Sequence, residues 1–292
     1  MKRRDFLCHT CRAGLAAAAG AIGGLPDARK LLAEGPGPAA ASADPKAKIV
    51  LIGHKPDHPP GTHLYLKECR LLAKCLRQTA GVEAVVSDGW PRESALLEGV
   101  TALVLYSSPG AELLFRKEHA QEAEALLKRG VGFTALHWAT GIATPDEKTP
   151  LADRYLAALG GIFGFGWSKL KISPAKVEPA ASDHPICRGW SAFDLKDEWY
   201  LDLRFRPGAK PIAKVRVDGK DQVVAWAYDR EDSGGGRSFG NTLGHFHENF
   251  GREPLRKMIV NGILWTAHRE IPPGGAPCRI DRQDMTVEQA RK

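Results

Sequence analysis

Cysteine and long apolar runs are both scarce in this sequence, and each scarcity excludes a class of protein. Six cysteines occur in 292 residues, and the four beyond residue 43 are spread widely along the chain. Such spacing predicts packed thiols rather than a disulfide framework or a zinc finger. The weakly apolar stretch 13–25 is too short and too rich in small side chains to anchor the chain in a membrane.

A concentrated charge of one sign is also missing. The formal net charge is +7, of which the first 43 residues contribute +3, from six Lys and Arg against three Asp and Glu. Elsewhere basic residues are interspersed with acidic ones, as in Arg116-Lys117-Glu118 and Arg252-Glu253. Nucleic-acid binding usually needs Lys and Arg gathered on one face. We therefore predict no nucleic-acid partner.

The N-terminus has the order of features of an export signal. Arg3-Arg4 precedes Phe6-Leu7, the apolar stretch follows, and Ala41-Ser42-Ala43 ends in a small-x-small cleavage motif. A disordered basic tail would not explain this order. The sequence predicts a twin-arginine signal over residues 1–43.

Cleavage of that signal sets the expected organisation of the mature protein. It would begin at Asp44, with a leader over 44–46, one domain over 47–270 and a surface tail over 271–292. We expect it in the periplasm or outside the cell, with no stable membrane insertion after cleavage.

Hydrophobic periodicity predicts an α/β domain. Apolar strands are expected at 48–53, 82–86, 102–106 and 131–136, with helices at 62–78, capped by Thr62, and at 116–128. This order predicts a mainly parallel sheet with helices on both faces. The later segments 171–177, 199–205, 212–217 and 223–228 indicate an antiparallel extension of that sheet, before a last strand at 240–244 and a helix at 253–268.

Six of the ten histidines follow three of the predicted strands. The polar and aromatic residues at those strand ends are His54, Asp57, His58 and His63, then His137 and Trp138, then His245, His247 and Glu248. Ligands of open parallel sheets bind outside the carboxyl ends of the strands. The histidines are therefore expected to lie near one site.

Three interpretations of these histidines stay open. His245 and His247 would share one side of an extended segment and bind a divalent metal such as zinc or manganese, with His58, His63 or His137. Alternatively, the histidines act as acid and base without a metal. The third interpretation is structural, with ring nitrogens capping helices or bonding to carbonyls.

Two further segments bear on the chemistry. His137 stands where a nucleophile elbow would present Ser or Cys, which argues against acyl transfer. The glycine-rich stretch 160–166 follows a helix rather than the first strand, so no nucleotide cofactor is predicted. Glu198 is flanked by aromatic residues in Asp197-Glu198-Trp199-Tyr200, a combination common in carbohydrate sites, although a solvated glutamate is the simpler alternative.

These segments resemble the ThuA-like (trehalose utilisation) family, whose fold is related to class I glutamine amidotransferases. The likeness spans about 47–270 and is carried, in order, by 49–53 with the 58–63 loop, 132–141, 182–186, 197–200 and 242–265. It implies a flavodoxin-like, class I glutamine amidotransferase-like three-layer sandwich without the catalytic cysteine, since His137 stands at the elbow. It also implies His58, His63, His137, Glu198 and His245 as pocket residues and an exported branch of the family.

The family is associated with trehalose and related disaccharides, particularly sugars oxidised at carbon 3. Our leading hypothesis is an enzyme that removes a proton beside the carbonyl of a keto-sugar or oxidised glycoside, with His137 or Glu198 as base and a histidine-bound metal polarising the carbonyl. The residues expected to contact the sugar are His54, Asp57, Trp138, Trp199, Tyr200 and Glu248. A non-catalytic sugar-binding protein and a metal-dependent hydrolase are the alternatives.

Overall fold

The computed structural model describes residues 46–287, apart from 117 and 232. The predicted signal lies outside the described residues. Within them, no helix combines the length and apolarity needed to cross a membrane.

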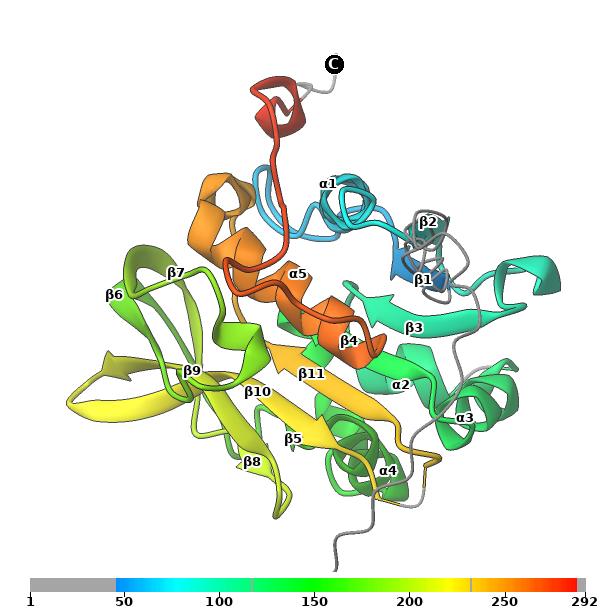
Figure 1. The fold of residues 1–292 in the computed structure, drawn as a ribbon. Coiled ribbons are helices and arrows are strands. Elements are labelled where there is room, and N and C mark those ends of the chain that lie inside the picture. The colour runs from blue at the N-terminus through cyan, green and yellow to red at the C-terminus, as the bar shows by residue number, and fades with distance from the viewer. Residues whose placement is uncertain (1–45, 117, 232, 288–292) are drawn as a thin grey trace, which may run out of the picture. The chain divides into compact units, whose positions relative to one another are not determined.

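A nine-stranded mixed sheet organises the domain, in the order β2-β1-β3-β4-β11-β10-β9-β6-β7 (Figure 1). Its parallel half consists of β1 (Ala47–Gly53), β2 (Val82–Asp88), β3 (Val100–Leu105), β4 (Gly132–Leu136) and β11 (Arg237–Asn241). Its antiparallel half consists of β6 (Lys169–Pro179), β7 (Phe193–Leu201), β9 (Lys210–Val217) and β10 (Lys220–Asp229). A two-stranded sheet pairs β5 (Gly161–Ile162) with β8 (Arg204–Phe205).

Helices cover both faces of the parallel half, which gives three layers (Figure 1). One face carries α1 (Tyr65–Leu76) and α5 (Glu253–Thr266), and the other carries α2 (Gly110–Phe115), α3 (Ala120–Lys128) and α4 (Pro150–Leu159). Successive side chains of a strand point to opposite faces. Ile49 and Leu51 of β1 accordingly pack in the first core, whereas Val50 and Ile52 pack in the second. The expected three-layer α/β fold with an antiparallel extension is confirmed.

Several predicted boundaries were wrong. Thr62 does not cap α1, because its hydroxyl donates to the carbonyl of Pro59 and the helix begins at Tyr65. The region predicted as a helix at 116–128 begins just after α2 has ended at Phe115, and only its part from Ala120 to Lys128 forms a helix, α3. The segment 199–205 is divided between β7 and β8 at Asp202, whose φ of 57° interrupts an extended strand.

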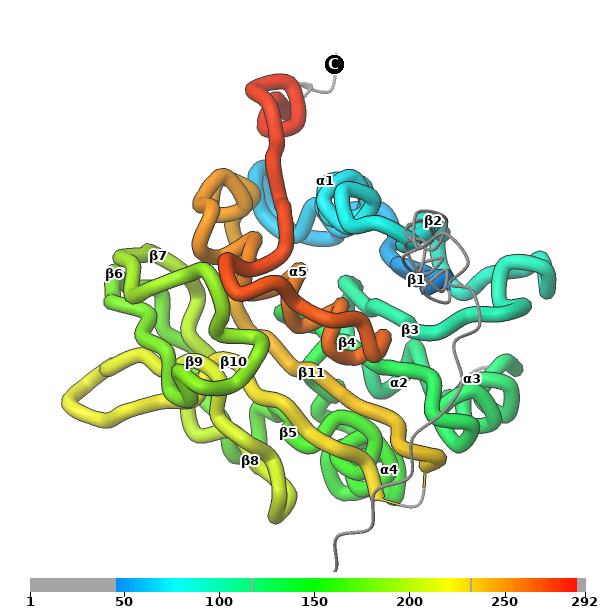
Figure 2. Tube along the Cα trace, in the orientation of Figure 1, coloured from blue at the N-terminus to red at the C-terminus, as the bar shows by residue number. Residues whose placement is uncertain are grey.

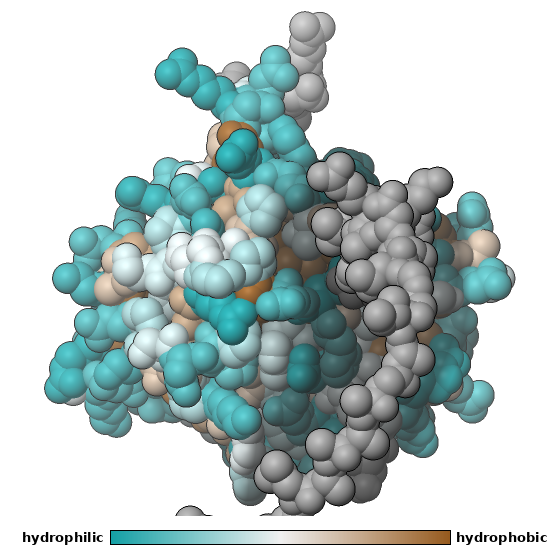
Figure 3. All heavy atoms as spheres, in the orientation of Figure 1, coloured by the Kyte–Doolittle hydropathy of each residue, from teal (hydrophilic) through white to brown (hydrophobic). Residues whose placement is uncertain are grey.

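The segment after α5 was predicted to lie on the surface, but part of it is buried. Ile271, Ala276 and Cys278 pack into the core beside α5, and the Ala276 N–H donates to Asn261 of that helix. Figure 2 shows this segment running back along α5 and then past α1. The four cysteines of the described residues are free and buried, as expected for packed thiols. The face drawn in Figure 3 is mostly hydrophilic where its residues are described.

Candidate metal centre and cleft

Four side chains from distant parts of the chain converge beyond the carboxyl ends of β1, β4 and β11. The His63 Nε2 atom lies 2.9 Å from His245 Nδ1 and 2.9 Å from His137 Nε2, and the last two atoms are 3.2 Å apart. The Glu198 Oε2 atom lies 3.4 Å from His245 Nδ1 and 3.6 Å from His137 Nε2. Each residue therefore offers one ligand atom to a common point, as a metal site requires.

Backbone pairing between two loops brings His63 and His245 together. The His63 N–H donates to the His245 carbonyl at 3.1 Å, and Thr62 forms an antiparallel bridge with Phe246. Asp197 on β7 holds the loop that contains His245. Its buried carboxylate accepts the N–H groups of Gly244 and His245 at 2.8 and 3.0 Å. Sequence reasoning missed this anchoring role, although Asp197 stands beside Glu198.

His137 occupies the turn directly after β4. Its φ of 50° lies in the left-handed region that non-glycine residues rarely adopt, as does the φ of 49° at His63. Such backbone conformations cost free energy and concentrate at functional sites. The His137 ring is fully buried, and its Nδ1–H donates to the Thr242 carbonyl at 2.8 Å.

Hydrogen bonding leaves the facing ring nitrogens without protons. Because a neutral imidazole carries one N–H, the bond from His137 Nδ1 to Thr242 assigns a bare lone pair to its Nε2. His63 Nδ1 lies 2.7 Å from the Tyr65 hydroxyl, which is itself hydrogen-bonded to Asp57, so the proton of His63 is assigned to Nδ1. Two lone pairs 2.9 Å apart repel unless a cation lies between them.

Protonation does not supply that cation at neutral pH. Burial, followed by the neighbouring histidines, lowers the pKa of His63 to about 3 and that of His137 well below its ordinary value. The Nε2 atoms of His63 and His137 therefore face the cluster as neutral lone pairs, which could bind a metal.

The donor set fits a divalent transition metal. Ligands about 2.1 Å from an ion and 90–110° apart are separated by about 3.0–3.4 Å, close to the 2.9–3.2 Å between the three nitrogens. Imidazole suits zinc, and a carboxylate also suits manganese. The bonds from His137 to Thr242 and from His63 to Tyr65 are the outer-shell contacts that orient metal-binding histidines.

A cleft of about 230 Å³ opens beside this cluster and is lined by His58, His63, Trp138, Phe163, Phe165, Leu170, Glu198 and Tyr200. Four of these residues provide aromatic rings other than imidazole. Phe163 and Phe165 were missed by the sequence analysis, which considered their glycine-rich stretch only as a nucleotide loop. Phe163 is placed there because it pairs with the turn after β4, where it bridges Gly141.

Asp57 and His58 form a dyad near the mouth of the cleft. The His58 Nδ1 atom lies 2.6 Å from Asp57 Oδ1, and both side chains are about one-third exposed, at 37% and 34%. The His58 ring also lies over that of His63, with the centroids 3.6 Å apart. His58 is thus part of the site but outside the group of four donors.

The structure corrects the expectation for His247. It does not join His245, because Gly244, with a φ of 105°, redirects the chain after β11 and a short helix begins at His247. The His247 Nδ1 atom instead lies 2.5 Å from Glu68 Oε1, and its Nε2 atom lies 3.0 Å from the Met285 carbonyl.

Four residues expected to contact the substrate do not line the cleft. One is Asp57, which pairs with His58 near the mouth. Trp199 is fully buried on the opposite side of β7 from Glu198 and donates from its indole to Ser173. Glu248 is exposed outside the cleft. His54 accepts the Ser108 N–H and lies against the Tyr65 ring, so it supports the helix that follows.

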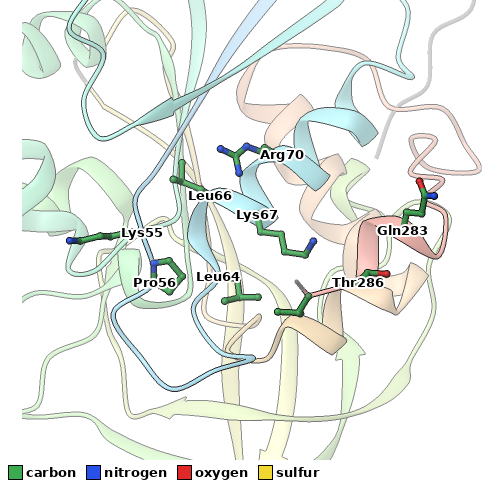
Figure 4. A pocket seen from close by; sticks show the side chains of 9 residues that line it. Lys55, Pro56, Leu64, Leu66, Lys67, Arg70, Gln283 and Thr286 are labelled. Atoms are coloured by element: carbon green, nitrogen blue, oxygen red, sulfur yellow. The ribbon is translucent and has the colours of Figure 1, made fainter. Parts of the chain in front are cut away.

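A larger hollow lies elsewhere, between α1 and the C-terminal segment (Figure 4). It has a volume of about 760 Å³, and its lining includes Lys55, Leu64, Lys67, Arg70 and Thr286. None of the four metal donors lines it, so size alone does not identify the functional site.

Comparison with known proteins agrees with this architecture. The family model described as trehalose utilisation, ThuA, matches residues 57–266. No curated protein matches the chain. A ThuA-like protein from Bacteroides uniformis has a similar structure, with a TM-score of 0.59, 17% identity, and coverage of 82% of this chain and 98% of that one.

Two further structures are similar to this chain. A cytoplasmic protein from Salmonella typhimurium has a TM-score of 0.54 and 15% identity, with 75% of this chain and 99% of that one covered. A glutamine amidotransferase from Thermotoga maritima is more distant, with a TM-score of 0.40 and 14% identity over 76% of this chain and 90% of that one.

Proposed function

The chain belongs to the ThuA (trehalose utilisation) family, and we propose that it is an exported metalloenzyme that removes a proton beside the carbonyl of an oxidised sugar. The observation that carries the proposal is the convergence of His63, His137, His245 and Glu198 next to a cleft with aromatic walls. The twin-arginine motif supports the export proposed here.

The three histidines would hold the ion, which when bound would polarise a carbonyl oxygen and stabilise the negative charge that develops as the neighbouring C–H proton leaves. Because the Nε2 lone pair of His137 is directed at the other donors, His137 serves as a ligand and not as the base. We therefore propose Glu198 as the base.

Glu198 is the proposed base rather than a ligand, because its Oε2 atom lies 3.4 and 3.6 Å from His245 Nδ1 and His137 Nε2, farther than the 2.9–3.2 Å between the three ring nitrogens. Its side chain is 14% exposed, lines the cleft and lies next to the cluster. A carboxylate held close to a reacting C–H group is an effective general base. His58, oriented through its bond to Asp57, returns a proton to the product from the mouth of the cleft.

The walls of the cleft support a sugar as the substrate. The half-buried Trp138 presents its ring beside Glu198, and the buried Tyr200 ring lies behind it, with the two centroids 6.5 Å apart. Ring faces pack against the C–H faces of a pyranose, while the carboxylate accepts hydrogen bonds from hydroxyl groups. An oxidised disaccharide provides both the carbonyl and the ring.

The test compares Glu198→Gln with a matched variant, Glu248→Gln, in which an exposed glutamate outside the cleft is changed. We incubate each protein with a disaccharide oxidised at carbon 3 and identify the products. Glu198→Gln should lose at least about 100-fold in turnover, as expected for a general base, while Glu248→Gln keeps its rate. Full activity in Glu198→Gln contradicts the proposal.

The nature of the product separates the alternatives. Products of elimination or isomerisation support proton abstraction. Incorporation of oxygen from labelled water at the cleaved bond, without exchange of the C–H proton, identifies a hydrolase instead. Saturable binding without any product identifies a sugar-binding protein.

A further inference from the structure

Large apolar side chains are exposed at the mouth of the cleft. Among the described residues, five large hydrophobic side chains are exposed, and three of them are Phe165, Leu170 and Ile172, at 52%, 39% and 50%. Apolar residues that gather on a surface commonly mark a binding site, whereas isolated ones are ordinary. We refer to these three residues as the apolar strip.

Strand pairing places the strip on the side of the sheet that carries the cleft. Leu170 lies directly opposite Tyr200, and Ile172 directly opposite Glu198, in the antiparallel ladder of β6 and β7. Residues directly opposite each other in such a ladder share a face. Since Tyr200 and Glu198 line the cleft, Leu170 and Ile172 extend the same surface outward.

The strip is also continuous with the aromatic wall. Leu170 and Phe165 line the cleft themselves, and the Phe165 ring lies 5.8 Å from that of Trp138 and 5.0 Å from that of Phe163. A ligand that occupies the cleft and projects outward therefore passes over the strip.

On β6 the charged residues next to Leu170 and Ile172 point away from the apolar strip. The lysines at 169 and 171 lie between the apolar positions in sequence, so the pleat directs them to the other face, where Lys171 pairs with Asp218. A second sugar would place hydroxyl groups against Leu170 and Ile172, which offer them no hydrogen-bond partner, so a disaccharide should bind less tightly here than a glycoside with an apolar aglycone. An apolar group matches this surface.

The volume of the cleft also indicates that part of the substrate lies outside it. At about 230 Å³ it is smaller than the roughly 300–1,000 Å³ of sites that enclose a drug-sized ligand. A substrate larger than one sugar ring must extend beyond it, over Phe165 and its neighbours.

We propose that the apolar strip binds an aromatic or otherwise apolar aglycone attached to the oxidised sugar, so that the preferred substrates are keto-glycosides of apolar alcohols and phenols. This inference rests on the proposed function. It adds the chemical class of the group that lies outside the cleft.

The test uses methyl and phenyl glucosides oxidised at carbon 3, in both anomeric forms, with the full mature protein. The phenyl substrate should have a kcat/KM at least about 10-fold above that of the methyl substrate, mainly through a lower KM. Leu170→Ser and Ile172→Ser should each remove most of that preference, since a hydrophobic contact is worth about 10-fold or more in discrimination. Val287→Ser removes another exposed apolar side chain, outside the cleft, and should leave the preference unchanged.

Other outcomes contradict the inference in distinct ways. Equal efficiency on both substrates, or a preference that survives both serine variants, overturns the strip as an aglycone site while the proposed function stands. A wild-type dimer that Ile172→Ser dissociates in sedimentation experiments shows that a second copy covers the strip, which also overturns the inference.

If neither keto-glucoside reacts, the proposed function fails and binding decides the inference. Calorimetric titration with phenyl and methyl glucoside then measures the affinity for the apolar group separately from any catalysis. Binding of the phenyl compound at least about 10-fold more tightly, lost in Ile172→Ser, supports the strip as an apolar subsite. Equal or absent binding overturns it.

Discussion

Removing the Tyr65 hydroxyl tests whether the histidine cluster is built for a metal. Tyr65 is buried at the start of α1, where its hydroxyl lies 2.7 Å from His63 Nδ1 and hydrogen-bonds to Asp57. Tyr65→Phe keeps the ring and its packing against Tyr106. The substitution therefore removes the group that fixes the orientation and tautomer of His63.

Two magnitudes follow from this geometry. Loss of an outer-shell partner of a metal-binding histidine typically costs 10–100-fold in metal affinity, or about 1.4–2.7 kcal/mol. In the metal-free protein, the buried Nδ1–H of His63 loses its partner, at a cost of about 1–3 kcal/mol in unfolding free energy. The lower end applies if Asp57, whose Oδ1 lies 3.7 Å from His63 Nδ1, takes over the bond.

Zinc affinity is measured by competition with a chromophoric chelator, and stability by urea unfolding in the presence of EDTA. Tyr155→Phe is the matched control, since the hydroxyl of this buried tyrosine donates to the Ala139 carbonyl and not to a metal donor. It should lose stability but keep its zinc affinity. Wild-type zinc affinity in Tyr65→Phe would refute the role assigned to His63.

Two further predictions concern the fold. Burial raises the pKa of Glu112, and its Oε2 atom has no partner. A raised carboxyl pKa means that stability is lost as pH rises above about 4.5. Glu112→Gln should therefore be more stable than wild type at pH 7 but not at pH 4, as measured by urea unfolding. A wild-type advantage at pH 7 would contradict this. Gly132→Ala places a Cβ 2.2 Å from the backbone oxygen of Thr266 and should lower the unfolding free energy by about 3 kcal/mol, whereas an unchanged urea midpoint would show that the backbone adapts freely.

The sequence was sufficient to predict which strands end near the site. Short apolar runs at β1, β3 and β4 indicated a parallel sheet, and the carboxyl ends of parallel strands meet at one edge. The proximity of His63, His137 and His245 follows from that rule alone. The position of His137 directly after β4 was predictable because a short apolar strand precedes it.

Errors arose where local backbone geometry decides the direction of a side chain. His245 and His247 were assigned to one side of an extended segment, but β11 ends at Asn241 and Gly244 turns the chain. Neither feature has a strong signal in the sequence. Trp199 was a different error, because strand alternation already excludes placing it on the same face as Glu198.

Supporting contacts were beyond the sequence for another reason. Asp197 acts through partners far away in the chain, since it binds the backbone of Gly244 and His245. Only the folded arrangement shows that a buried carboxylate holds a loop in place. Patterns of periodicity and spacing carry no information about such pairs.

The metal content of the purified mature chain tests the central claim most directly. Wild type is compared with a His63→Ala, His245→Ala double variant and with His119→Gln, which alters a histidine outside the cluster; circular dichroism confirms that each is folded. We predict about one zinc or manganese ion per chain in wild type and His119→Gln, and none in the double variant. A wild-type protein without metal after incubation with divalent ions, or a double variant with the same metal content, would contradict the account.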